Sequence, residues 1–391
     1  MKKTVDGTIR KYYSSEQFTF LQAYFTWDRL YDEMREFVEL SRIRRREPGN
    51  STMRKMLSLH CLNIRIRSPR DNVCDVCSIY MTKMRHGGAT LDTTEELGRH
   101  TETARRMRLE YKGDLKAASD THAVLVMDFS QNLTCPSISD TPSMWYFLSL
   151  LSISGFEIDY ANDAKQCKYI YDERVSGKAT DQVNPLMHDF PEKNAIPRHI
   201  RRLTVYADRC GGQNKSNHVI HFFLALVRQG LLDMVDFKFF VCEHTKNACD
   251  RGFGQIRNRM GRVDCWTVDD VVKNVAAAGN SSVVKRVTVE DNIFRDFKTV
   301  IQTTKTSPND AGISEDLRRN IDKVKTPRSK VALMFERYLM PLTPPQPNAE
   351  KIDQMHRKVR PFVPSEFQND PLYAAPTADE AASQRIPSVP D

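Results

Sequence analysis

The chain has 391 residues, 40% hydrophobic and 28% charged, a composition typical of a globular protein with two or three domains. Because no apolar run approaches the roughly 18 residues of a membrane span, we expect no membrane partner. The basic N-terminus lacks the apolar core of a secretory signal. The net charge is +8, and residues 1–122 hold 23 Lys and Arg against 17 Asp and Glu. This uneven charge favours a polyanionic partner such as nucleic acid.

The first third of the chain predicts helices. Apolar residues recur at helical spacing over residues 16–40, which indicates one long amphipathic helix or a helix pair. Residues 91–118 predict a further, charged helix. Between them, a basic run could follow nucleic-acid phosphates and is a weak nuclear-localisation signal; it comprises Arg42, Arg44, Arg45 and Arg46.

From residue 123 onward the pattern changes to short apolar runs, which predict β-strands. The expected strands are 123–128, 145–153, 156–160, 168–173, 201–208 and 235–243, with a turn at Ser154-Gly155. Helices are expected at 178–189, 215–230 and 247–260. Strands alternate with helices in the second half, so we expect an α/β fold with a mixed sheet, partly parallel and flanked by helices.

Three aspartates occupy related places in this scheme. Asp128 ends the first strand, Asp208 ends a later strand, and Asp250 opens a helix. Carboxylates so placed can converge on one edge of a sheet, where their oxygens suit two Mg²⁺ or Mn²⁺ ions that act on a phosphodiester. Each also has a structural explanation, because aspartate is common in turns and at helix N-termini.

Polar residues near these aspartates could support such a site. Gly211-Gly212 permits close backbone approach, and Asn214 and Lys215 offer donors at a helix start, where phosphate binds well. The spacing does not match a phosphate-binding P-loop, so we expect no nucleotide triphosphate or other small-molecule substrate. Before Asp250, three residues could assist catalysis, although a capping network would also explain the last of them: Glu243, His244 and Asn247. Arg251 and Arg257 follow on the same predicted helix and could contact nucleic acid.

Several strings together resemble a family of transposon-derived, transposase-like proteins. They are DNVCDVC, ELGRHTETARRMRLEYKGD, MDFSQNL, YIYDERVSGKATDQV, YADRCGGQNKSN and EHTKNACDRGFG, within residues 55–300. The resemblance implies a ribonuclease-H-like core with three catalytic, metal-binding carboxylates, carried onto Asp128, Asp208 and Asp250. It implies DNA strand cleavage and transfer, as in the integration of a transposable element, by an enzyme that could act as a homo-oligomer in the nucleus.

Cys74-x-x-Cys77 supplies half of a candidate structural zinc site. His100 lies 23 residues beyond Cys77 and is the third expected ligand, with His60, Cys61 and His86 as candidates for the fourth. The alternative is a pair of buried thiols at a helix start. All nine cysteines are compatible with a reducing compartment, because they show no repeating disulfide pattern.

These patterns divide the chain into four expected parts. Residues 1–118 form a basic helical region with the candidate zinc site, and residues 119–262 form the ribonuclease-H-like core. Residues 263–340 form a mixed extension, and the proline-rich residues 341–391 a disordered tail. Two alternatives to a transposase-like DNA enzyme stay open: an inactive DNA-binding or chromatin protein on the same fold, and a metal-dependent nuclease that cleaves RNA or an RNA–DNA hybrid.

Overall fold

The computed structural model describes residues 19–21, 26–43, 46, 48–66, 73–88, 90–244, 247–302, 304–309, 312–317, 327–378 and 380. The chain divides into two compact units, residues 1–78 and 79–391, and the boundary falls inside helix α3 (Asp75–Arg85). The chain between Ser78 and Ile79 is therefore a continuous helix.

The described part of the first unit contains two short strands, two helices and the start of α3. Strand β1 (Thr19–Leu21) pairs in parallel with β2 (Ile64–Ile66). Helix α1 (Trp27–Leu40) begins where the Thr26 side chain accepts a hydrogen bond from the Arg29 amide. Asp28 then accepts hydrogen bonds of 2.6 Å from Asn50 and Arg54 of helix α2 (Asn50–His60), which joins the two helices. Within the predicted helical segment 16–40, residues 19–21 therefore form a strand, and α1 begins at Trp27.

A seven-stranded mixed sheet forms the centre of the second unit, in the order β8-β7-β3-β5-β6-β9, with β4 paired to β5. Strand β3 runs antiparallel to β5 and β5 antiparallel to β6, whereas β7 and β8 run parallel to β3. The strands are β3 (His122–Phe129), β4 (Leu133–Cys135), β5 (Leu151–Tyr160), β6 (Lys165–Asp172), β7 (Arg202–Ala207), β8 (Met234–Phe239) and β9 (Ser282–Arg286).

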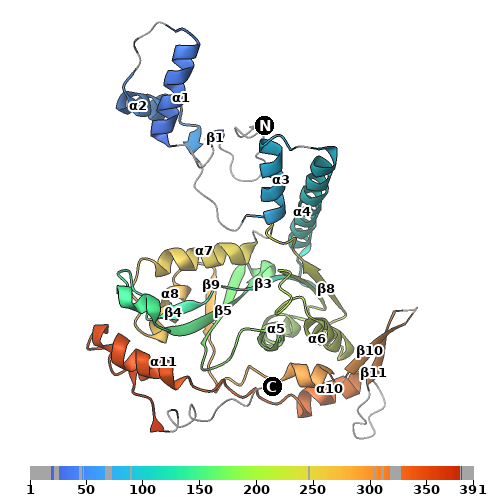
Figure 1. Ribbon diagram of the computed structural model, residues 1–391. Helices are drawn as coiled ribbons and strands as arrows, with labels where there is room; N and C mark the ends of the chain where they lie inside the picture. Colours follow the sequence, from blue (N-terminus) through green and yellow to red (C-terminus); the bar gives the residue numbers. More distant parts are fainter. Residues whose placement is uncertain are drawn as a thin grey trace. The chain divides into compact units, whose positions relative to one another are not determined.

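Helices cover both faces of the sheet. Alternate residues of β3, such as Leu125 and Met127, enter the largest hydrophobic cluster with helices α5 (Thr180–Asn194) and α6 (Asn217–Arg228). Val126 enters a second cluster with α7 (Ala248–Met260) and α4 (Leu91–Ala117). Figure 1 shows α5 and α6 on one side of the sheet and α7 on the other. The mixed, helix-flanked sheet predicted from the sequence is confirmed.

The segment around Ser154-Gly155 differs from the prediction of two strands joined by a turn. Residues 151–160 form one continuous strand, and Ser143–Phe147 is a 3-10 helix, η1, instead of the start of a strand. Gly155 pairs with Ile170 of β6 and is a close-packing position, because a Cβ there would lie 2.9 Å from Ser130 Oγ. The glycine thus accommodates a neighbouring side chain within a strand, a role that local sequence does not distinguish from a turn.

Residues 341–378 also differ from the expected disordered tail. Helix α11 (Ala349–Gln354) continues into η4 (Met355–Val359), η5 (Arg360–Phe362) and, further on, η6 (Pro371–Tyr373). Met355, Val359 and Tyr373 are buried in a hydrophobic cluster that includes Trp145 and residues of α7 and α8 (Val268–Ala276). The prolines restrict the backbone of this segment, and its buried apolar residues are widely spaced. The sequence therefore shows no helical or strand period that would predict the packing. Residues 381–391 lie outside the described part of the chain.

The expected core boundary at residue 262 also cuts through the sheet. Strand β9, from the predicted extension, pairs in parallel with β6. The extension further contains α9 (Phe297–Gln302), the hairpin β10 (Thr304–Asn309) and β11 (Gly312–Leu317), and α10 (Pro327–Arg337). Among the described helices, none is both long and apolar enough to cross a membrane.

Candidate functional site

Asp128 and Asp208 lie side by side at one edge of the central sheet. Val126 of β3 pairs with Tyr206 of the parallel strand β7, so residues 128 and 208 follow at the same level two positions later. Asp128 has the same parity along β3 as Val126, whose side chain packs toward α7. The two aspartates therefore reach the sheet edge on neighbouring strands, beside the face that α7 covers.

The Asp208 side chain is held by the loop that follows it. Its Oδ1 atom accepts a 2.6 Å hydrogen bond from Asn214 Nδ2 and a 3.2 Å bond from the Cys210 amide. Asn214 is fully buried, and its own Oδ1 has no hydrogen-bond partner among the described residues. The buried amide fixes the orientation of the Asp208 carboxylate, with both bonds directed to one oxygen.

Asp250 caps the helix that carries it. Its carboxylate accepts a 2.8 Å hydrogen bond from the Asn247 amide, while Asn247 Oδ1 accepts a 3.0 Å bond from the Asp250 amide. This capping box also explains why Asn247 is buried. One residue before Asp250, Cys249 Sγ donates to the Val126 carbonyl oxygen at 3.4 Å, which brings the first turn of α7 onto β3.

The negative charges of Asp208 and Asp250 act on the Asp128 carboxyl group. Burial, with the negative charges of Asp208 and Asp250, raises the pKa of Asp128 to about 7. A cation at this edge would relieve that repulsion, because it would favour the charged form of Asp128. Among the described residues, the group of three or more possible metal ligands that lies close together is a separate cysteine–histidine cluster, which does not include these carboxylates.

Glu157 is a fourth carboxylate, which the sequence pattern does not single out. It lies opposite Asp128 on β5, is completely buried, and forms an ion pair of 3.4 Å with buried Lys168. Burial raises its pKa to about 8, although Lys168 opposes the shift. The string FEIDY alternates polar and apolar residues and so predicts an outward-facing Glu157. Its side chain is covered because Gly252 of α7 leaves room for it: a Cβ on this glycine would lie 2.8 Å from the Glu157 carboxyl carbon.

Lys178 is a cation near the same edge that the sequence pattern also leaves unmarked. Its ammonium group donates to the Ser130 carbonyl and, at 3.1 Å, to Asn132 Oδ1. Burial lowers the pKa of Lys178, while the nearby Asp128 charge acts in the opposite direction. Only its place in the string YIYDERVSGKATDQV could have pointed to it, because a lone lysine in a loop carries no positional signal.

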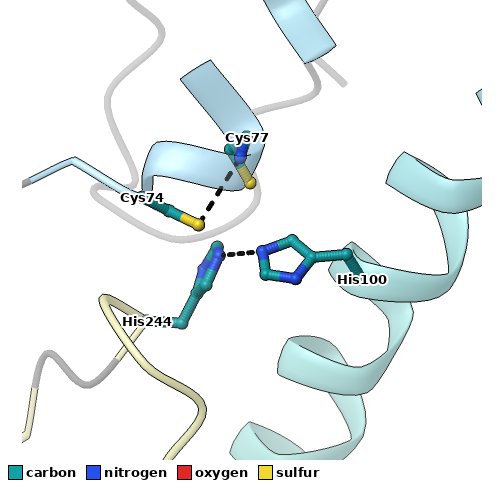
Figure 2. Close-up of side chains that lie close together, drawn as sticks. All are labelled: Cys74, Cys77, His100 and His244. Carbon is teal, nitrogen blue, oxygen red and sulfur yellow. Dashed lines mark hydrogen bonds between the residues drawn. The ribbon is translucent and has the colours of Figure 1, made fainter. Parts of the chain in front are cut away.

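A second site combines two cysteines and two histidines. Cys74 and Cys77 lie at the start of α3, His100 lies on α4, and His244 follows β8. One potential ligand atom from each lies within 4.8 Å of all the others. Figure 2 shows the two sulfur atoms and the two imidazole rings turned toward a common point. This group could hold a metal ion such as zinc.

The local geometry of this cysteine–histidine cluster is compatible with tetrahedral coordination. The His100 and His244 Nε2 atoms are 2.9 Å apart, somewhat closer than the roughly 3.3 Å between two nitrogen ligands of tetrahedral zinc. The Cys77 amide donates a hydrogen bond of 3.5 Å to Cys74 Sγ. The sequence predicts three members of the cluster; the fourth is His244, not His60, Cys61 or His86. The sequence pattern suggests His244 only as catalytic support for the carboxylates.

The candidate nucleic-acid-binding residues lie in different places. Arg42 and Arg46 are exposed in the first unit, while Arg44 and Arg45 lie outside the described residues. In the second unit, Lys215 is exposed at the start of the α6 segment, and Arg257 is exposed and donates a 2.9 Å bond to Gln131 Oε1. Arg251 lines a polar pocket with Asp159, whose partner across the strands is Val126. Glu243 is exposed and adopts a left-handed backbone conformation with φ of 59°.

Comparison with known protein families shows a match in the second unit. Residues 158–323 match the model of a domain of unknown function, DUF7869. Searches of the curated proteins and of the solved structures found no match to the chain.

The matched segment contains only part of each site. It includes Asp208, Asp250 and His244, but Asp128 and the other members of the cysteine–histidine cluster precede it. Both sites therefore depend on residues from outside the matched segment.

Proposed function

We propose that the chain is a transposase-like enzyme that cleaves and transfers DNA strands with the help of two Mg²⁺ or Mn²⁺ ions. The observation that carries this proposal is the placement of three carboxylates at one sheet edge. Asp128 and Asp208 are level on neighbouring parallel strands, and Asp250 lies on the first turn of the helix packed beside them. Such an arrangement can hold cations against a phosphodiester.

The strand order supports assigning the core to the ribonuclease-H-like type. In the central sheet, the antiparallel strands β3, β5 and β6 precede two strands parallel to β3, and helices lie between these later strands in the chain. This is the order of strands and helices expected for that core. In this order Asp128 lies on β3, Asp208 directly follows β7, and Asp250 lies on α7, the helix that follows β8.

The proposed chemistry assigns distinct tasks to the residues at this edge. Asp128 and Asp208 would hold the ions, and Asp250 would complete the set of ligands. The ions would lower the pKa of a water molecule, or of a DNA 3′-hydroxyl group, and stabilise the departing oxygen. Under this proposal Lys178 and Lys215 would contact phosphate groups, which would position the strand without reading its sequence.

The test is a cleavage assay with the purified full chain and end-labelled DNA in Mg²⁺ or Mn²⁺. Asp128→Asn should reduce nicking at least about 100-fold, since it removes a metal-binding charge while preserving shape. Asp140→Asn is the matched control, because Asp140 is an exposed aspartate elsewhere in the same unit. Equal rates for the two variants would contradict the proposed site.

The choice of substrate separates this function from its alternatives. Parallel reactions with duplex DNA, RNA and an RNA–DNA hybrid would identify a ribonuclease by its preference. DNA binding without cleavage of any substrate would instead favour an inactive DNA-binding protein. Under the proposal, duplex DNA is nicked and its 3′-hydroxyl end is joined to a second duplex. DNA as the partner and a nuclear location follow from this reaction.

We further propose that the metal in the cysteine–histidine cluster is zinc with a structural role. Two sulfur and two nitrogen ligands match the preference of Zn²⁺, whereas Mg²⁺ and Mn²⁺ prefer oxygen. Four protein ligands leave no position open for a substrate, which is typical of structural zinc sites.

A further inference from the structure

The cysteine–histidine cluster and the carboxylate edge are connected by a short stretch of chain. His244 belongs to the cluster, Asn247 caps α7, and Asp250 is the third carboxylate. Three peptide units separate His244 from Asn247, so their Cα atoms can be at most about 11 Å apart. A displacement of His244 must therefore be absorbed within those few residues or passed to the first turn of α7.

The partner of His244 is anchored independently to the sheet. The far end of α4 packs against β7 and β8: the Tyr111 ring lies 4.9 Å from the Tyr206 ring, and Asp114 accepts bonds of 2.6 Å from Tyr206 and 2.7 Å from Lys238. The C-terminal part of α4 is thus held against the sheet, and the same helix carries His100 in the cluster.

The loop after β8 is held to the same helix by its backbone. Arg108 of α4 donates a 2.8 Å hydrogen bond to the His244 carbonyl oxygen. The loop contains Glu243 in a left-handed conformation, a backbone shape that non-glycine residues adopt only at a cost. A bond from the His244 ring to a metal would attach the loop a second time, in addition to the Arg108 hydrogen bond. Together the two attachments would fix the position of the end of this loop.

We infer that zinc in the cysteine–histidine cluster acts as a clamp that sets the start of α7 and thereby positions Asp250 for its own cations. His244 is, on this inference, a positioning residue instead of a catalytic one. The inference rests on the proposed function for the identity of the second metal site. The ordering of α7 by zinc does not depend on whether the chain is catalytically active.

The experiment compares His244→Ala with His244→Cys, in which a thiolate can again bind zinc. The control is His86→Ala, since His86 is an exposed histidine next to α3 that lies outside the cluster. Zinc content is measured by mass spectrometry, Mn²⁺ affinity by titration, and the order of α7 by amide hydrogen exchange over residues 247–256. These readouts need no catalytic turnover.

We expect His244→Ala to lose zinc, to bind Mn²⁺ at least about 10-fold more weakly and to exchange the α7 amides faster, as loss of an orienting interaction near a metal site does. His244→Cys should restore all three properties, and His86→Ala should leave them unchanged. Retention of zinc by His244→Ala would overturn the inference. Loss of zinc with unchanged Mn²⁺ affinity and unchanged exchange would overturn it too, while leaving the proposed function intact.

The two proposals can fail separately. If the zinc-loaded wild-type chain binds no Mn²⁺, the proposed function fails. Hydrogen exchange then decides the clamp alone: zinc-dependent protection of residues 247–256 supports it, and protection that is independent of zinc contradicts it.

Discussion

Asp128 makes the stability of the metal-free chain depend on pH. Because its pKa is raised to about 7 in the folded chain, the folded state binds a proton that the unfolded state releases near its ordinary value of 3.8. This carboxyl therefore costs no stability below the ordinary pKa, and its cost grows as the pH rises, becoming complete above about 7.

Asp128→Asn should accordingly stabilise the chain in buffer without added Mg²⁺ or Mn²⁺, and more so at about pH 8 than at about pH 5. Urea unfolding of both proteins at the two pH values measures the difference. Stabilisation that is the same at both pH values would show that the Asp128 carboxyl titrates normally.

Gly252 gives a second prediction at the scale of single residues. Gly252→Ala should destabilise the chain by about 1–3 kcal/mol, because the added Cβ would collide with the buried Glu157 carboxylate. Gly254→Ala is a matched control on the same helix: its Cβ would meet nothing within 4 Å, and alanine is the better helix former by about 1 kcal/mol. Thermal unfolding should move in opposite directions for the two variants, and a shift in the same direction would argue against the packing of Glu157 beneath α7.

At the scale of elements, the segment from α11 to η6 is part of the hydrophobic core. Met355 is buried in the cluster with Trp145, whereas Lys358 is exposed in the same segment. Met355→Ala should lower the free energy of unfolding by about 2–5 kcal/mol through the cavity it leaves, and Lys358→Ala should change it little. Equal urea midpoints for the two variants would mean that residues 341–378 do not contribute to the folded core.

The elements that could be predicted are those whose signal is local. Strands β3 and β7 are short, mostly apolar runs, and α6 has helical periodicity, so their positions follow from burial and backbone geometry alone. The sequence pattern divides β5 wrongly at Gly155, since the reason for a glycine there is the Ser130 side chain, which comes from another part of the chain. The α11 segment escapes prediction because its apolar contacts are distant in sequence and follow no period.

At the scale of the whole molecule, the predicted site residues are those with a local sequence signal, and the unpredicted ones depend on contacts between distant parts of the chain. The sheet edge that carries Asp128 and Asp208 follows from the rule that parallel strands end together. Glu157 and Lys178 reach that edge only through tertiary packing. The spacing of Cys74 and Cys77 predicts a metal site. His244, in contrast, lies 144 residues beyond His100, and no spacing rule identifies it as a ligand.

This separation has a consequence for the growing polypeptide. During synthesis from the N-terminus, Cys74, Cys77 and His100 leave the ribosome before any strand of the central sheet, and His244 emerges only after β8 is complete. A nascent chain therefore carries an incomplete set of metal ligands throughout the synthesis of the strands from β3 to β8. Bringing His244 to His100 closes a loop of 144 residues, which costs entropy until the sheet has brought the two ends together. Metal binding by all four ligands should therefore follow the assembly of β3, β7 and β8.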